Sequence, residues 1–124
     1  MPATATYVRG EVEGQRLRAT APSGGVVVNQ VVVIRSGATG MIGVAITAAS
    51  AGEEYTVAIT GVWRITKNTT TSAGVFSQGD VVYLDVADAN VSSQASANIK
   101  AGIAAAAAAA AETTADVLLI PSKA

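Results

Sequence analysis

The segment Gly43-Val44-Ala45-Ile46-Thr47-Ala48-Ala49-Ser50-Ala51-Gly52-Glu53 returns 59 residues later as Gly102-Ile103, eight alanines and Glu112. Six of these eleven positions are identical in the two copies. Upstream, Val28–Ile34 resembles Gln78–Leu84 at an offset of 50 residues. Self-similarity at a fixed spacing indicates a repeated structural unit. We therefore predict an internal two-fold pseudo-repeat with halves at roughly 26–65 and 75–121, the second carrying about nine extra residues near 86–98.

The repeat guides the interpretation of the alanine run Ala104–Ala111. Alanine has the highest helix propensity, so a short helix is the alternative. The counterpart of this run in the first half, Val44–Thr47, is rich in β-branched residues, which favour strands. The next residues of the first half, Ser50-Ala51-Gly52, are typical of a turn. We predict a strand followed by a turn, with Ala109-Ala110-Ala111 in the turn.

The rest of the sequence is typical of short β-strands. Valine runs at Val26–Val28 and Val31–Ile34 suit strands that are buried on both faces. Polar and apolar residues alternate over Arg16–Ala21, as in a strand with one face in solvent. Turn-forming residues separate such segments every 8–12 residues or so, which is the spacing of sandwiches and barrels. We predict an all-β fold, a small β-barrel or β-sandwich forming one domain over 9–124, preceded by an extended N-terminal arm over 1–8.

The composition points to contact with other subunits. The chain has 124 residues, of which 50% are hydrophobic, mostly Ala and Val. Charged residues make up 14%, against about 25% in typical soluble domains. One explanation is a neutral surface of Ala, Thr and Ser. We favour the other, in which part of the surface is covered by neighbouring subunits, because interface cores are depleted in charge.

Missing residue types exclude several kinds of chemistry. The chain has no histidine, the usual general base and metal ligand, and no cysteine. It has no Gly-Lys pair of the kind that a phosphate-binding loop requires. Asp85, Asp88 and Asn90 imitate the start of a calcium loop but lack its glycine and closing glutamate, so a turn is expected. We predict no enzyme activity, no cofactor and no metal site.

Charge and hydropathy limit the partners as well. The net charge is −1, and acidic and basic residues are interspersed, so no basic stripe is available for nucleic acid. The longest apolar run, Ile103–Ala111, is far shorter than the roughly 20 residues of a membrane-spanning helix. We expect a protein that is made and kept soluble, with neither nucleic acid nor membrane as a partner.

Residues for protein contacts are expected in the arm and around the largest apolar side chains. An extended arm can add a strand to the sheet edge of a partner. For Trp63 and Phe76 core packing is the first interpretation, and a role as interface anchors is the second. Arg64 and Lys67 would then form a polar rim, although a solvated strand edge explains them equally well. The predicted interface residues are Thr4, Thr6, Tyr7, Arg9, Trp63, Arg64 and Phe76.

Several short motifs occur in a characteristic order along nearly the whole chain. They are Thr20–Val26, Ile42–Ala45, Ala51–Glu53, Gly61–Trp63, Gln78–Tyr83 and an Ala-rich stretch closing with Val117–Leu119. In this order they resemble the DUF2190 family of small phage proteins, sometimes labelled a RecA/RadA-type recombinase and now associated with capsid decoration, or cement. The sequence departs from that pattern at Asn29-Gln30, where an Ala-Gly-Asp-like turn is usual, at Ser92–Asn98 and in the extended alanine run.

The resemblance implies a structural role. It implies a β-rich subunit that assembles, as a homotrimer, on the outer surface of a phage head and binds the major capsid protein. Such a protein is synthesised in the cytoplasm of the bacterial host, and the family has no catalytic residues to carry over. The main alternative is another virion component, such as a tail, fibre or baseplate β-domain. A nucleotide-dependent recombinase and a monomeric β-barrel for a small ligand are the further alternatives.

Overall fold

The computed structural model describes residues 4–9, 16–35, 41–95 and 98–120, and its regular structure consists of β-strands. No helix occurs among these residues, so none could cross a membrane. The ten strands are β1 (Ala5–Arg9), β2 (Arg16–Thr20), β3 (Val31–Arg35), β4 (Met41–Ala45), β5 (Glu54–Ala58), β6 (Gly61–Thr66), β7 (Val81–Asp85), β8 (Asn90–Ser92), β9 (Ile99–Ala104) and β10 (Thr114–Leu119). The all-β prediction is confirmed.

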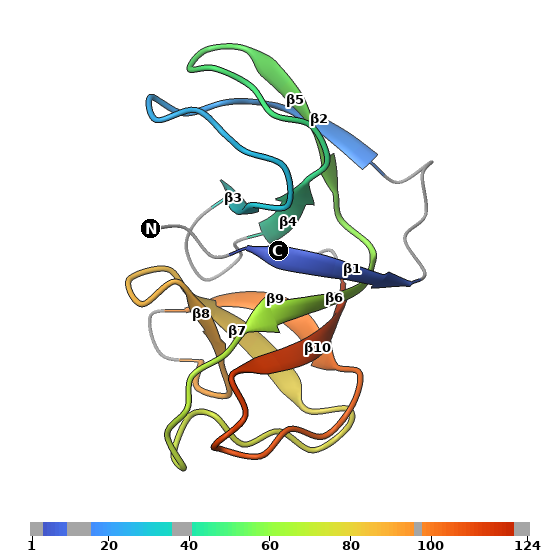
Figure 1. Ribbon diagram of the computed structural model, residues 1–124, viewed down its shortest axis with the longest axis vertical. Coiled ribbons are helices and arrows are strands. Elements are labelled where there is room, and N and C mark those ends of the chain that lie inside the picture. Colours follow the sequence, from blue (N-terminus) through green and yellow to red (C-terminus); the bar gives the residue numbers. More distant parts are fainter. Residues whose placement is uncertain (1–3, 10–15, 36–40, 96–97, 121–124) are drawn as a thin grey trace.

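The strands form two antiparallel sheets, one above the other in Figure 1. The upper sheet has the order β2-β5-β4-β3, and the lower has the order β1-β6-β10-β9-β7-β8. The lower sheet curls into a half-barrel. Its last strand, β8, returns to the chain that follows β6, where the Asn68 N–H donates to the Val91 carbonyl at 2.9 Å. Strand β1 crosses the middle of the view, between the two halves of the molecule.

Apolar residues pack in two layers because the four-stranded sheet is covered on both faces. Its lower face, with Val31 and Val44, joins Trp63 and Val117 of the other sheet in the main core. Its upper face, including Val32, belongs to a second cluster. Neighbouring valines of β3 therefore point into different cores, and this explains why the run lacks polar alternation. The prediction of a strand buried on both faces is confirmed for Val31 and Val32. It is wrong for Val26–Val28, which belong to no strand and leave Val27 and Val28 exposed.

The internal repeat appears in the strand order. In the first unit β2-β5-β4-β3 pair in the same order as β6-β10-β9-β7 in the second. Outside the strands, Val26 and Ala49 exchange two backbone hydrogen bonds of 2.8 and 3.0 Å. Their counterparts Phe76 and Ala108 exchange two of 3.0 and 2.9 Å. The same backbone scaffold is thus built twice.

The boundary between the units differs from the predicted one. The sequence placed 61–65 in the first half, but β6 pairs with β10 and β1, so it belongs to the second unit. The structural units run from β2 to β5 (16–58) and from β6 to β10 (61–119). Gly61 lies between them with a φ of 102°, a conformation open mainly to glycine, and it redirects the chain from one sheet to the other.

The turn at Asn29-Gln30, where the sequence leaves the family pattern, keeps its geometry. Asn29 has a φ of 70° and takes the place of Gly79, whose φ is 91°. Asparagine tolerates this left-handed region better than most residues. The Gln30 side-chain oxygen accepts the Val27 N–H at 3.1 Å, just as the Asp80 carboxylate accepts the Ser77 N–H at 2.8 Å. The two turns therefore have one backbone form with different side chains.

The alanine run forms strand and then turn, as the repeat predicts. Ala104 ends β9, and Ala109 begins a turn in which the Glu112 N–H donates to its carbonyl at 3.1 Å. The Glu112 carboxylate accepts the Ala109 N–H at 2.8 Å. Glu53 makes the equivalent bond to the Ser50 N–H at 2.9 Å. The glutamate common to both copies closes the turn, and the alternative of a helix is wrong.

Gly43 and Gly102 are equivalent positions at which the sheets allow no side chain. A Cβ at Gly102 would lie 2.0 Å from the Leu118 carbonyl oxygen. A Cβ at Gly43 would lie 2.4 Å from a methyl group of Val57 and 2.7 Å from the Ala58 carbonyl oxygen. Because carbonyl groups within a ladder cannot move aside cheaply, both positions require glycine.

We expect Gly102→Ala to lower the free energy of unfolding by about 2–3 kcal/mol, since overpacking forces the backbone of β9 away from β10. Chemical denaturation of the purified protein measures this change. Gly24→Ala is the matched control, because nothing lies within 4 Å of a Cβ at Gly24. Equal stability of the two variants would contradict the proposed close approach.

Candidate interaction surfaces

The described part of the predicted N-terminal arm is a strand of the chain's own sheet. In β1, Thr6 pairs with Arg64 and Tyr7 pairs with Trp63 across the ladder with β6. Ala5 is buried in the main core. The arm expected over 1–8 therefore lies, from residue 4 onwards, within the folded unit, and 1–3 lie outside the described residues. A deletion of 1–8 would therefore remove most of strand β1 from the sheet, and not only an arm that reaches a partner.

Strand β1 and the residue before it hold four of the predicted interface residues, and all four are exposed. Thr4, Thr6 and Arg9 are exposed, and the Tyr7 side chain is 51% exposed. The Tyr7 ring meets the Trp63 ring edge-on, with centroids 5.1 Å apart and an angle of 64° between the planes. Such pairs stabilise through both area and ring electrostatics. Tyr7 thus covers the core and offers its other side to the surface.

Trp63 and Phe76 take the first of the two roles expected for them. Each is only 2% exposed and belongs to the main core. The Trp63 Nε1–H donates to the Thr60 carbonyl at 2.9 Å, so its polar atom is satisfied inside the chain. Both rings are therefore buried within the single chain, and their role as interface anchors stays a prediction.

Arg64 forms a surface ion pair across the lower sheet. Its guanidinium donates to both carboxylate oxygens of Asp116, at 2.9 and 3.3 Å. This hydrogen bond, together with the negative charge of Asp116, raises the pKa of Arg64. Arg18 of the first unit makes a similar pair with Glu54 at 3.2 Å. Exposed pairs of this kind add little stability, so Arg64 is placed on the surface but already has a partner there.

Lys67 is not part of a polar rim, because it is buried. Only 2% of the residue is exposed, and its ammonium group donates to three backbone carbonyls. The acceptors are Asn68 at 2.8 Å, Gly74 at 2.6 Å and Ala110 at 3.1 Å. This lysine ties the Thr/Ser-rich loop after β6 to the turn of the alanine run. No feature of the sequence singled it out for this role, since the carbonyls come together only in the fold.

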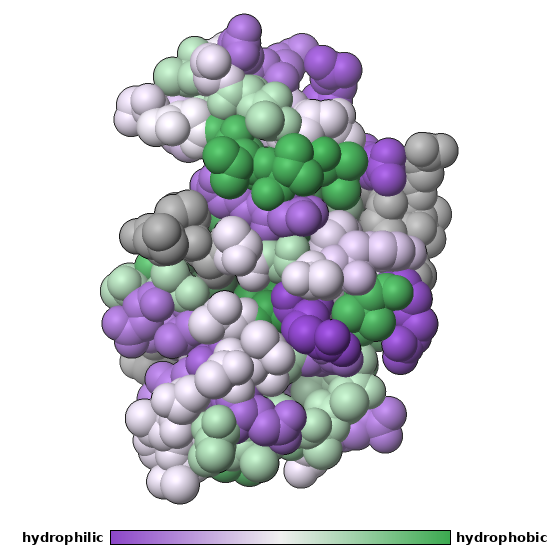
Figure 2. Space-filling model, in the orientation of Figure 1, coloured by the Kyte–Doolittle hydropathy of each residue, from purple (hydrophilic) through white to green (hydrophobic). Residues whose placement is uncertain are grey.

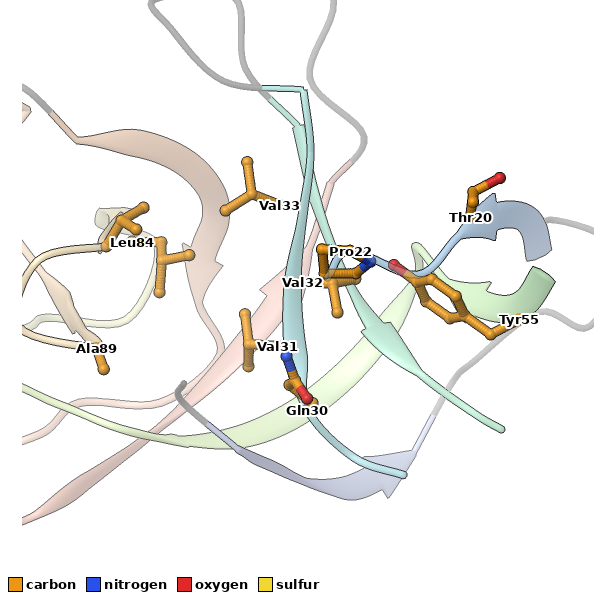
Figure 3. Close-up of a pocket in the computed structure, with 10 residues that line it drawn as sticks. Thr20, Pro22, Gln30, Val31, Val32, Val33, Tyr55, Leu84 and Ala89 are labelled. Carbon is orange, nitrogen blue, oxygen red and sulfur yellow. The ribbon is translucent and has the colours of Figure 1, made fainter. Parts of the chain in front are cut away.

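An uncharged hollow of about 330 Å³ lies beside β3. Val31, Val33 and Leu84 line it on one side of the strand, and Val32 and Tyr55 on the other (Figure 3). Among the described residues, no charged side chain lines it. Burial raises the pKa of the Tyr55 phenol, so this group too stays neutral at physiological pH. No pattern in the sequence predicts this hollow, because its walls come from strands far apart in the chain.

Exposed valines surround the approach to β3. Val27 is 58% exposed and Val28 is 50% exposed, in the turn that leads into the strand. Val33 is 38% exposed within the strand itself. Figure 2 shows a compact hydrophobic patch in the upper half of the molecule, the part that holds the four-stranded sheet and its loops. An exposed apolar patch on an otherwise neutral surface marks a contact site.

The described residues assemble no reactive centre. Among them no group of three or more acidic, histidine or cysteine residues is placed to hold a metal ion. The calcium-like start at Asp85 and Asp88 forms a turn, in which the Asp88 N–H donates to the Asp85 carboxylate at 3.2 Å. What the structure presents to its surroundings is a set of sheet edges and apolar surfaces, and such features bind other proteins.

Comparison with known protein families agrees with this geometry. A family model described as phage cement protein matches residues 12–119, which is most of the chain. The chain belongs to the phage cement protein family. No curated protein and no solved structure matches it. Membership confirms the resemblance to cement proteins noted in the sequence.

A cement protein has a structural role. The family assigns this chain to the phage capsid, where it stabilises the shell and binds capsid proteins. A structural family of this kind implies that the chain is not an enzyme. The surfaces of this cement protein are therefore to be interpreted as adhesive contacts.

Replacing Lys67 by Met should lower the free energy of unfolding by about 3 kcal/mol, because one buried and two partly buried carbonyls lose their donor. Thermal and chemical denaturation provide the measurement. Lys100→Met serves as the control, since Lys100 is exposed. If both variants unfold at the same denaturant concentration as the parent protein, the buried ammonium does not hold the loop.

Proposed function

We propose that this cement protein decorates the outer surface of the phage head and bridges neighbouring subunits of the major capsid protein. The family match over residues 12–119 carries the proposal, because it places the chain in the capsid. The uncharged hollow and the exposed valines support it, since both suit contact with another protein. Synthesis takes place in the host cytoplasm, before the protein attaches to finished heads.

Attachment through modest contacts is sufficient for this role. A shell offers many identical sites, and a decoration protein that touches two subunits at once gains from the high effective concentration of the second contact. We propose that the exposed residues of β1 and just before it, Thr4, Thr6, Tyr7 and Arg9, and the neighbouring Arg64 take part in these contacts. The ring of Tyr7 suits such a place, because aromatic residues are enriched at binding surfaces.

We also propose that the subunits assemble as a homotrimer. The charged fraction of 14% supports assembly, because it leaves much of the surface without charge. Interface cores are depleted in charged residues in the same way. Neither nucleic acid nor membrane is proposed as a partner, since the net charge of −1 provides no attraction to phosphates.

The purified protein should sediment together with undecorated phage heads and should raise the temperature at which those heads break open. Both effects follow if the chain bridges capsid subunits, because each bridge must be broken before the shell opens. Ultracentrifugation followed by gel quantification measures the first effect, and a thermal release assay for packaged DNA measures the second. A protein that stays in the supernatant at saturating concentration would favour the tail, fibre or baseplate alternative.

Native mass spectrometry of the free protein should show three chain masses, if the neutral surface is buried between subunits. Dilution over three orders of magnitude, roughly from micromolar to nanomolar, tests whether the assembly is tight. A single chain mass at every concentration would refute the homotrimer. It would leave capsid binding to be judged by cosedimentation alone.

A further inference from the structure

The two units differ in how their sheet edges are covered. In the second unit β8 lies along β7, with Tyr83 opposite Ser92 and Leu84 opposite Val91. This strand comes from the extra residues near 86–98 that distinguish the second half. Strand β3 is the counterpart of β7, yet no described residue of the first unit forms a counterpart of β8. Of the described residues, only Thr4 bridges to the outer edge at the start of β3, opposite Gln30.

Over Val31–Val33 the outer edge of β3 carries none of the usual protection, and the one charged residue of the strand, Arg35, stands at its end. Exposed edge strands are normally guarded by charges or proline, because their unpaired N–H and C=O groups attract other strands. The opposite edge of the same sheet, β2, carries Arg16 and Arg18. Strand β3 begins with three valines, and Val33 is 38% exposed. An apolar edge of this kind is stable in solution only if something covers it in the working state.

The hollow beside β3 has the shape that an added strand requires. Because residues from both faces of β3 line it, it opens along the free edge of the strand (Figure 3). Val31 and Val33 lie on the side of Leu84 and Ala89, and Val32 lies on the side of Tyr55. A strand laid against this edge would place alternate side chains on the two faces, into the two halves of the hollow.

The repeated turn shows that the exposed valines next to this edge are not required by the fold. Val27 and Val28 occupy the positions that Ser77 and Gln78 occupy in the second unit. The two turns have the same backbone hydrogen bond, of 3.2 and 3.0 Å. Polar residues therefore build the turn equally well. Of the two turns, only the one next to the edge of β3 has apolar residues at these positions. We therefore interpret Val27 and Val28 as residues that contact a partner.

We propose that the outer edge of β3 accepts an extended, uncharged, β-branched segment of the shell protein, added as a strand in the position that β8 occupies on β7. The inference rests on the proposed function. Backbone hydrogen bonds to the edge supply affinity, and alternate apolar side chains in the hollow supply specificity. Because none of the described side chains that line the hollow is charged, a charged segment would lose its hydration without gaining a partner among them.

A second copy of the chain suits this edge less well than a single extended segment. The turn between β7 and β8, with Val86 and Ala89, forms one wall of the hollow. If the β3 strands of two copies paired about a two-fold axis, the β7–β8 turn of each copy would collide with the β3 edge of the other. A single strand has no such wall and can enter between the turn and the sheet.

The decisive comparison is between Val33→Lys and Val81→Lys. Both valines are 38% exposed, but Val33 lies on the uncovered edge and Val81 lies on β7. Titration of undecorated heads, followed by sedimentation, gives an apparent dissociation constant for each variant. We expect Val33→Lys to weaken binding at least tenfold and Val81→Lys to change it less than twofold. Equal binding of Val33→Lys and the parent protein would overturn the proposal.

A second variant guards against loss of folding. Val27→Ser combined with Val28→Gln copies the turn of the second unit and leaves β3 unchanged, so it is expected to fold and to bind heads more weakly. Hydrogen exchange across 31–34 in the parent protein should slow on heads, because an added strand protects the outward amides of β3. Unchanged exchange in the bound state would overturn strand addition. If Val33→Lys instead breaks up the native assembly while its subunits still bind heads, a second copy of the chain occupies the β3 edge.

Failure of this inference can be told from failure of the proposed function. If the parent protein itself does not sediment with heads, the proposed function fails, and the strand acceptor fails with it. If the parent protein binds, and Val33→Lys and the double variant at Val27 and Val28 bind as well as the parent does, the proposed function stands. Only the assignment of the β3 edge is then wrong.

Discussion

The outermost strand of a β-sheet leaves a row of backbone N–H and C=O groups without partners, and the architecture of this protein follows from that constraint. The second unit covers both of its edges from within the chain, with β1 against β6 and β8 against β7. In the first unit the outer strands are β2 and β3, and neither receives such an addition among the described residues. One unit is completed by its own chain, and the other can be completed by a neighbour on the capsid.

The two units use one backbone scaffold for different purposes. The glycines at Gly43 and Gly102 allow the same close approach of neighbouring strands in each unit. The second unit holds the largest core side chains, Trp63 and Phe76, and is fastened by the buried ammonium of Lys67. The first unit is smaller, and its exposed valines Val27, Val28 and Val33 lie on or next to the outer edge of β3. A rigid half that supports an adhesive half is a suitable arrangement for a cement protein, because the bound strand must not deform the subunit that holds it.

Adhesion also explains why so little charge and no reactive chemistry are present. A charge at a protein contact must lose its hydration, and it stabilises the complex only if a partner of opposite sign is well placed. Backbone pairing and valine contacts avoid this cost. They are individually weak, but a shell repeats them many times, and repetition turns modest affinity into durable decoration. The family assignment and the physical character of the surface therefore lead to the same role.

Local patterns in the sequence determined the strand content, the repeat and the turns, because β-branched runs and turn residues act over a few positions. The repeat even overrode the helix propensity of the alanines at Ala104–Ala111. Only the tertiary structure decided which strand pairs with which. It assigned β6 to the second unit and β1 to the chain's own sheet, and it buried Trp63, Phe76 and Lys67. These outcomes depend on contacts between residues far apart in the chain, and a single sequence carries no record of which distant edge or carbonyl a residue will meet.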